Sequence, residues 1–82
     1  MTLQSEIKQF ILQNFMFTSD DSALGDDESL MERGIVDSTG ILELVTHVEE
    51  TYGVKVQDSE MLPANLDSVA AISAFVGRKL GR

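Results

Sequence analysis

Ser38 is the side chain in this sequence that is best placed to do chemistry. It follows Gly34–Val36 and Asp37, and the residues after it begin a helical pattern with acidic side chains. The first N–H groups of a helix have no partner within the helix, and the helix dipole is positive at that end. Both features favour a phosphate ester on the Ser38 hydroxyl. On the dipeptide alone, an ordinary cap, with Asp37 accepting an N–H from Thr39 or Gly40, is the better explanation.

The other polar residues do not form a catalytic or metal-binding set. The chain has no cysteine, and its one histidine, His47, has no second histidine to pair with. The acidic run Asp20–Glu28 suggests a calcium loop by composition, but an EF-hand loop that began at Asp21 would place Asp26 where glycine is required. We therefore predict no catalytic residue and no metal site.

The helix that begins at Ser38 must position this hydroxyl. Asp37 is its expected N-cap, and apolar residues at steps of three and four predict a helix over Ser38–Tyr52. Gly53 follows as the residue that ends it.

Two further long helices are predicted from the same periodicity. The first covers Met1–Phe17 and is capped by Thr2. The last is capped by Asn65 or Asp67 and runs to about Leu80.

Two connections join these helices. The first, Thr18–Val36, is long and polar, with a helical turn expected over Glu28–Glu32, and connections of this length are often functional. The second, Lys55–Pro63, has room for a short helical turn at Ser59–Leu62. This turn is expected to end there, because Pro63 interrupts a helix. The chain is therefore all-α. The core positions predicted from the apolar stripes are Ile7, Ile11, Ile41, Val45, Val48, Val69, Ile72 and Val76.

Length and charge limit the classes of function. With 82 residues the chain is expected to form a single domain over residues 1–82. Six Lys and Arg against fourteen Asp and Glu give a net charge of −8, and the stretch from Asp20 to Glu50 holds ten carboxylates and one cation, Arg33. This charge repels nucleic acids and anionic membranes and attracts basic protein surfaces.

Composition also indicates where the chain works. No apolar run approaches the length of a transmembrane helix, and the absence of cysteine excludes disulfides and thiolate chemistry. We expect a cytoplasmic monomer that does not insert into membranes.

A wider set of segments surrounds Ser38 in a characteristic order. The segments are Leu30–Val36, Asp37-Ser38, Leu42–Val45, Glu49–Val56, Leu66–Val69, and a last helix with Phe75-Val76 and Lys79-Leu80. In a short acidic helical chain, this ordered set resembles the acyl carrier proteins of fatty-acid and polyketide synthesis. The resemblance covers essentially the whole chain.

The resemblance implies a four-helix bundle with a long first loop and a short third helix near Ser59–Leu62. It also implies that Ser38 carries covalent 4′-phosphopantetheine, which a separate phosphopantetheinyl transferase attaches from coenzyme A with Mg²⁺. Asp37 belongs to the same motif. The arm would supply the thiol that this chain lacks and would hold acyl groups as thioesters.

Partners are implied in the same way. They are the phosphopantetheinyl transferase, and acyl-activating ligases, synthases or acyltransferases with basic patches. The residues expected to contact them are Asp37, Thr39, Leu42, Glu43, Glu49 and Glu50.

The pair Thr39-Gly40 departs from the family pattern, which usually has Leu after the modified Ser. This variant resembles discrete carriers that are served by adenylate-forming acyl ligases. A glycine in a helical first turn costs up to about 1 kcal/mol relative to alanine, so Gly40→Ala is expected to stabilise the helix.

The sequence therefore predicts an acyl carrier protein and no enzyme. Two alternatives stay open: a carrier of aminoacyl or peptidyl groups, and an unmodified helical adaptor that binds basic partners.

Overall fold

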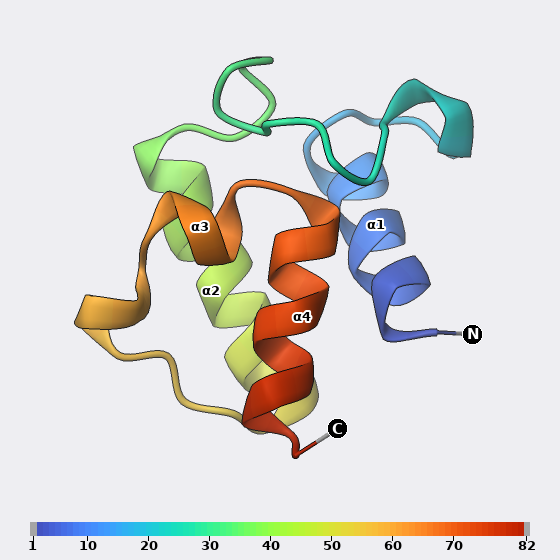
Figure 1. Cartoon of the computed structure of the whole chain (residues 1–82). Coiled ribbons are helices and arrows are strands. Elements are labelled where there is room, and N and C mark those ends of the chain that lie inside the picture. Colours follow the sequence, from blue (N-terminus) through green and yellow to red (C-terminus); the bar gives the residue numbers. More distant parts are fainter. Residues whose placement is uncertain (1, 82) are drawn as a thin grey trace.

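The computed structural model describes residues 2–81, and in this range the chain is an all-α bundle without strands (Figure 1). Figure 1 shows α4 between α1 and α3, with α2 behind them and the long first loop across one end of the bundle. The elements are α1 (Leu3–Asn14), η1 (Asp21–Ala23), α2 (Ser38–Tyr52), η2 (Asp58–Glu60), α3 (Pro63–Leu66) and α4 (Val69–Lys79), where η marks a 3₁₀ helix.

The first helix is confirmed with shorter bounds. The Thr2 side chain accepts the Ser5 N–H at 3.1 Å, as expected of its N-cap. The chain leaves the helix at Phe15, and Phe17 adopts a left-handed φ of 55°, which an α-helix cannot continue through. Met1 lies outside the described residues.

The second helix is confirmed at both ends. Asp37 is its N-cap, and the Gly53 N–H donates to the carbonyl of Glu49. Gly53 has a φ of 68°, the left-handed conformation that glycine adopts without a steric penalty at a helix end.

A short third helix is present, as the resemblance implied, but its predicted position at Ser59–Leu62 is wrong. That region holds η2, and the third helix begins at Pro63, the residue that we expected to interrupt it. Proline suits the first position of a helix, because the N–H that it lacks would have no intrahelical partner there.

The predicted cap of the last helix is also wrong. Ser68 is the N-cap of α4, and its hydroxyl accepts the Ala71 N–H at 3.0 Å. Asn65 lies inside α3, and Asp67 ends that helix.

The long loop is held by buried apolar side chains, since Leu24, Leu30 and Val36 are almost completely buried. The expected helical turn is present one residue later, where the Arg33 N–H donates to the Ser29 carbonyl at 3.2 Å. The 3₁₀ helix η1 was not predicted.

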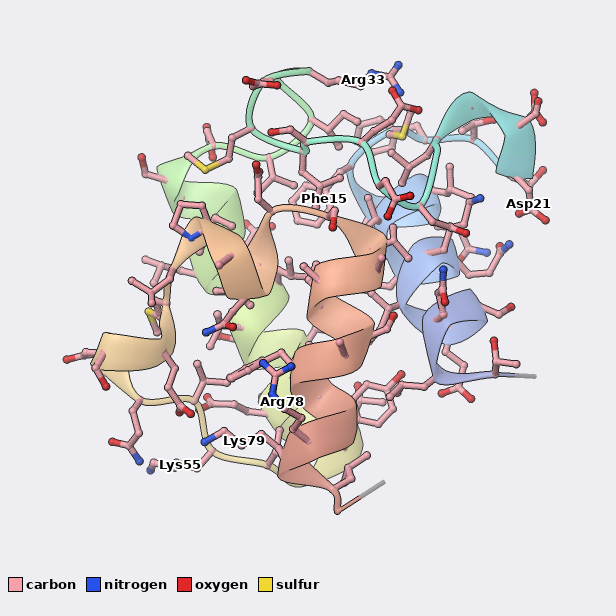
Figure 2. All side chains as sticks on the ribbon, viewed as in Figure 1. Phe15, Asp21, Arg33, Lys55, Arg78 and Lys79 are labelled. Atoms are coloured by element: carbon pink, nitrogen blue, oxygen red, sulfur yellow. The ribbon has the colours of Figure 1, made fainter. Side chains whose placement is uncertain are left out.

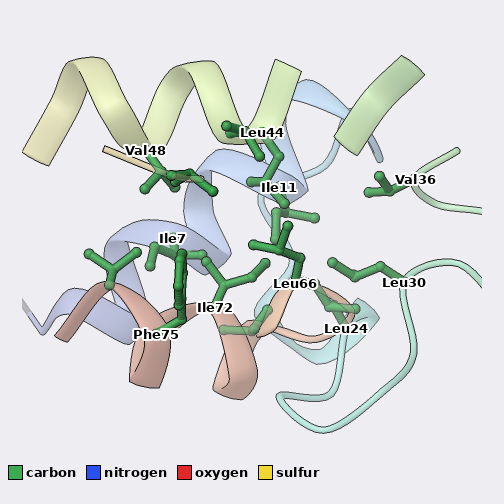
Figure 3. Close-up of a cluster of buried hydrophobic side chains, with 14 of the residues drawn as sticks. Ile7, Ile11, Leu24, Leu30, Val36, Leu44, Val48, Leu66, Ile72 and Phe75 are labelled. Carbon is green, nitrogen blue, oxygen red and sulfur yellow. The ribbon is translucent and has the colours of Figure 1, made fainter. Parts of the chain in front are cut away.

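One hydrophobic core joins the four helices and the loop. Figure 3 shows Leu44 and Val48 of α2 facing Ile7 and Ile11 of α1 and Ile72 of α4. Of the predicted core positions, only Ile41 is not fully buried, and it packs at the edge of the core.

A row of rings fills the seam between α1 and α2. The Phe10 and His47 rings stack with centroids 3.6 Å apart and planes at 9°, and Phe15 meets Phe10 edge-on at 5.9 Å. At the far end of the seam, the Tyr52 hydroxyl donates to Glu6 Oε1 at 3.0 Å, and burial with this bond raises the pKa of Tyr52 to about 12.

The charges are separated along the molecule. Figure 2 shows Lys55, Arg78 and Lys79 at the end of the bundle where α4 finishes, away from Asp21 and Arg33 in the long loop. The start of α2 lies at the opposite end of the bundle from these three cations (Figure 1).

Gly40 is buried, and its surroundings give a reason to expect the opposite sign for Gly40→Ala. A Cβ at this position would lie 3.1 Å from Phe15 Cε1, 3.2 Å from Val36 Cγ1 and 3.3 Å from Asp37 Oδ1. Glycine therefore serves close packing between α1 and the first turn of α2.

We expect Gly40→Ala to lower the free energy of unfolding by about 1 kcal/mol, because crowding of this kind costs about 1–3 kcal/mol and exceeds the helix-propensity gain. Urea unfolding measures the change. Adding Phe15→Leu should recover part of the loss by making room, whereas a Gly40→Ala protein more stable than the natural chain would contradict the packing argument.

Burial against Phe10 lowers the pKa of His47 below its ordinary 6.5, with a smaller opposing effect from Glu50. The unfolded chain then binds the proton more readily than the folded one, so this contribution to stability is complete above the unfolded pKa and is lost as the pH falls through the folded pKa. We expect the stability difference between the natural chain and His47→Gln to shrink from about pH 7.5 to about pH 5.5 in urea unfolding. A difference that grows on acidification would show that protonated His47 is favoured in the fold.

Candidate functional site

Ser38 is the first residue of α2, and its side chain is exposed. Asp37 Oδ1 accepts the Gly40 N–H at 2.7 Å, which fixes the first turn and leaves the Ser38 hydroxyl free of the capping role. The structure therefore assigns the cap to Asp37 and presents Ser38 to solvent at the positive end of a fifteen-residue helix.

The preceding loop delivers the chain to this point. The Ile35 and Val36 N–H groups both donate to the Leu30 carbonyl, at 2.9 and 3.3 Å. Gly34 lies between Leu30 and Ile35 and reverses the chain with a φ of 70°. Because the Leu30 side chain is completely buried, the core holds this turn in place.

Beside Ser38 is a pocket of about 380 Å³ between α2, α3 and the loop. Three side chains of this Ser38 pocket are large, apolar and exposed: Met31 at 47 %, Leu42 at 57 % and Leu62 at 51 %. Its lining is Met31, Ser38, Ile41, Leu42, Met61, Leu62, Pro63, Leu66 and Asp67.

Asp67 is the ionisable residue of this lining, and its carboxylate is already engaged. Oδ2 accepts a hydrogen bond from the Ser29 hydroxyl, and Oδ1 accepts the Met31 N–H at 2.9 Å. The pocket therefore presents an apolar surface next to the Ser38 hydroxyl.

One exposed stripe of α2 leads away from Ser38. It consists of Thr39, Leu42, Glu43, Thr46 and Glu50, which recur at helical spacing and are all exposed. Glu50 lies twelve residues from Ser38, about 18 Å along the helix axis.

Glu49 differs from the other predicted partner residues. It is half-buried, and its Oε2 accepts the Val56 N–H at 2.9 Å, which holds the chain after α2 against the helix. Glu43 and Glu50 carry the exposed charge of the α2 stripe.

The structure thus brings Asp37, Ser38 and Leu42 together, with Thr39 and Glu43 beside them. Sequence reasoning missed the far wall of the pocket, which consists of Met61, Leu62 and Asp67. The available signal was the apolar pair Met61-Leu62 before Pro63, which belongs to none of the predicted helix stripes.

The family model of the phosphopantetheine attachment site matches residues 6–76 of this chain. The chain belongs to the phosphopantetheine attachment site family. The predicted resemblance and the helical-bundle fold are therefore confirmed. No curated protein matches the chain.

Family membership defines the coarse chemistry. These domains are non-catalytic carriers that hold covalent 4′-phosphopantetheine, which a transferase attaches. The residues here fit that group, because an exposed hydroxyl at a helix start lies next to a pocket of apolar side chains.

Within residues 2–81, no three His, Asp or Glu side chains come together as metal ligands. None of the helices in this range combines the length and the apolar character needed to cross a membrane.

We expect the exposed charges of the α2 stripe to steer the transferase. Glu43→Lys and Glu50→Lys should each slow modification by roughly three- to tenfold at low ionic strength, and less at high salt, because screening weakens steering. Rates of arm attachment measured against salt test this.

Asp58→Lys is the matched control, since Asp58 is exposed in η2, off the α2 stripe. Equal effects of all three substitutions would indicate net charge alone, and no effect of any would remove the steering role.

Proposed function

We propose that this protein is an acyl carrier protein that holds acyl groups as thioesters on a 4′-phosphopantetheine arm attached to Ser38. The observation that carries the proposal is the exposed Ser38 hydroxyl at the start of α2, next to an apolar pocket. The arm supplies the thiol, and the chain supplies its anchor and the surface that partners recognise.

The lining of the Ser38 pocket favours acyl over aminoacyl or peptidyl cargo. An aminoacyl thioester carries an ammonium group, and burial of a charge without a partner is costly. The carboxylate of Asp67 could be that partner, but both of its oxygens accept hydrogen bonds from Ser29 and Met31. An alkyl chain gains from contact with Met31, Ile41 and Leu62.

Delivery follows from tethering and weak contact. The arm raises the effective concentration of the acyl group at a partner's active site. Partners must also dissociate, which suits an interface of exposed charges with a small apolar centre. We assign these contacts to Asp37, Thr39, Leu42, Glu43 and Glu50. Glu49 adds negative charge to this surface, although its Oε2 is bonded to the Val56 N–H.

The partners in this proposal are a phosphopantetheinyl transferase, an adenylate-forming acyl ligase, and synthases or acyltransferases of fatty-acid, polyketide or related biosynthesis. Thr39 supports the ligase, because it replaces the apolar residue that usually follows the modified serine. We further propose that the protein is cytoplasmic and monomeric. We also propose that residues 1–82 form one carrier domain, and the single hydrophobic core supports this last point.

Incubation with a broad-specificity phosphopantetheinyl transferase, coenzyme A and Mg²⁺ should add one arm to each chain, as seen in the intact mass. Ser38→Ala should abolish the addition, while Ser68→Ala, at a second helix start, should leave it intact. No addition to the natural chain would favour the unmodified adaptor.

The modified protein then separates the cargo classes. Loading by acyl and aminoacyl ligases, scored as thioesters, should favour acyl groups. Leu62→Asp, which places a charge at the pocket, should shorten the lifetime of an acyl thioester in water. Preferential loading with amino acids would support the aminoacyl alternative.

A further inference from the structure

Asp67 joins the end of α3 to the long loop through three hydrogen bonds. Its carboxylate accepts from the Ser29 hydroxyl and from the Met31 N–H at 2.9 Å, and its carbonyl accepts the Leu30 N–H at 2.7 Å. We call this set the Asp67 clasp. Asp67 and Ser29 lie 38 residues apart in sequence, so the clasp is a tertiary contact.

The clasp continues by hydrogen bonds to the start of α2. Leu30 receives the bond from Asp67 through its N–H, and its carbonyl accepts from Ile35 and Val36. Val36 is buried and directly precedes Asp37, which caps α2. A short path of main-chain contacts thus connects Asp67 to the residue before Ser38.

The clasp also sets one wall of the Ser38 pocket. Met31 is the residue of the long loop in the lining, and its N–H is bound by Asp67, which lines the same pocket. Met31 is 47 % exposed, so burial does little to hold it in place.

We propose that Asp67 is a positioning residue for Ser38. Through the Asp67 clasp it holds residues 29–36, and with them the entry to α2 and the Met31 wall, in the arrangement that the phosphopantetheinyl transferase recognises. This rests on the proposed function, in which Ser38 accepts the arm.

If Asp67 served stability alone, loss of its carboxylate would destabilise the whole bundle and would not act on the Ser38 site in particular. The loop is anchored independently by Leu24 and Leu30, whose side chains are buried, and by the Ala70 N–H, which donates to the Asp26 carbonyl at 2.9 Å. Loss of the carboxylate removes the bonds from the Ser29 hydroxyl and the Met31 N–H, so Ser29 and the Met31 wall should loosen locally. The bond from the Leu30 N–H to the Asp67 main-chain carbonyl should remain, and the bundle should stay folded.

The test measures arm attachment with transferase and coenzyme A, with the unmodified carrier as the varied substrate. In Asp67→Ala, KM for the carrier should rise about fivefold with kcat unchanged, if about one molecule in five keeps the competent arrangement, because apparent affinity falls with that fraction. Ser29→Ala, which removes one bond of the clasp, should give a smaller rise. Asp67→Asn keeps an acceptor for the Met31 N–H and should restore most of the affinity.

Two controls separate positioning from charge and from general stability. Asp27→Ala removes an equal charge from an exposed position in the loop, and Val48→Ala weakens the core ten residues along α2 from Ser38. Neither should change KM at a temperature where circular dichroism shows every variant folded. Amide hydrogen exchange of Asp67→Ala should accelerate at Met31, whose N–H loses its acceptor, and not in α1 or α4.

A folded Asp67→Ala protein that is modified with the same KM as Asp27→Ala would overturn the inference. If Asp67→Ala does not fold, Ser29→Ala decides, and a KM equal to that of the natural chain overturns it. Failure of the proposed function looks different, since the natural chain itself would then take no arm at Ser38.

Discussion

The burial of Leu30 is the contact on which the site depends. Its side chain is completely enclosed by the core, its N–H is held by Asp67, and its carbonyl accepts two N–H groups from the turn that leads into α2. A long polar loop would otherwise reach the helix start in many conformations, at a cost in entropy for each ordered residue. With Leu30 fixed, six residues of turn bring Asp37 to its cap, and the Ser38 hydroxyl occupies a defined place at the surface.

The second helix has one face in the core and another in solvent, which the proposed function assigns to partner recognition. Leu44, Val45 and Val48 are buried against α1 and α4, while Thr39, Glu43 and Glu50 stay in solvent. Charges on an exposed face can be selected for partner recognition with little effect on folding, because exposed pairs contribute little to stability. Glu49 is the exception, since its bond to Val56 gives it a part in the fold.

A carrier needs little chemistry of its own. This chain has no cysteine, and its family carries a covalently attached 4′-phosphopantetheine group, which supplies a thiol. What the protein contributes is placement: a hydroxyl that a transferase can reach, a neighbouring apolar pocket, and a negative surface along α2.

Local patterns in the sequence were enough to predict two of the helices and the residues that begin and end them. The helices α1 and α2, the caps Thr2 and Asp37, and the end at Gly53 all follow from periodicity and from side chains that bond within three residues. The same order of segments identified the carrier family. The start of α3 at Pro63 was within reach, because proline favours a first helical position as much as it opposes an interior one.

Only the tertiary structure decided which groups meet. Asp67 was interpreted as a helix cap until its partners proved to be Ser29 and Met31, and Gly40 appeared to be a weak helix former until Phe15 was found against it. The bond of Glu49 to Val56 and the pocket wall at Met61 and Leu62 were likewise visible only in the tertiary structure. A cap or an apolar stripe is encoded by neighbours a few residues apart. A contact between residues dozens of positions apart depends on how the helices pack, which no short stretch of sequence specifies.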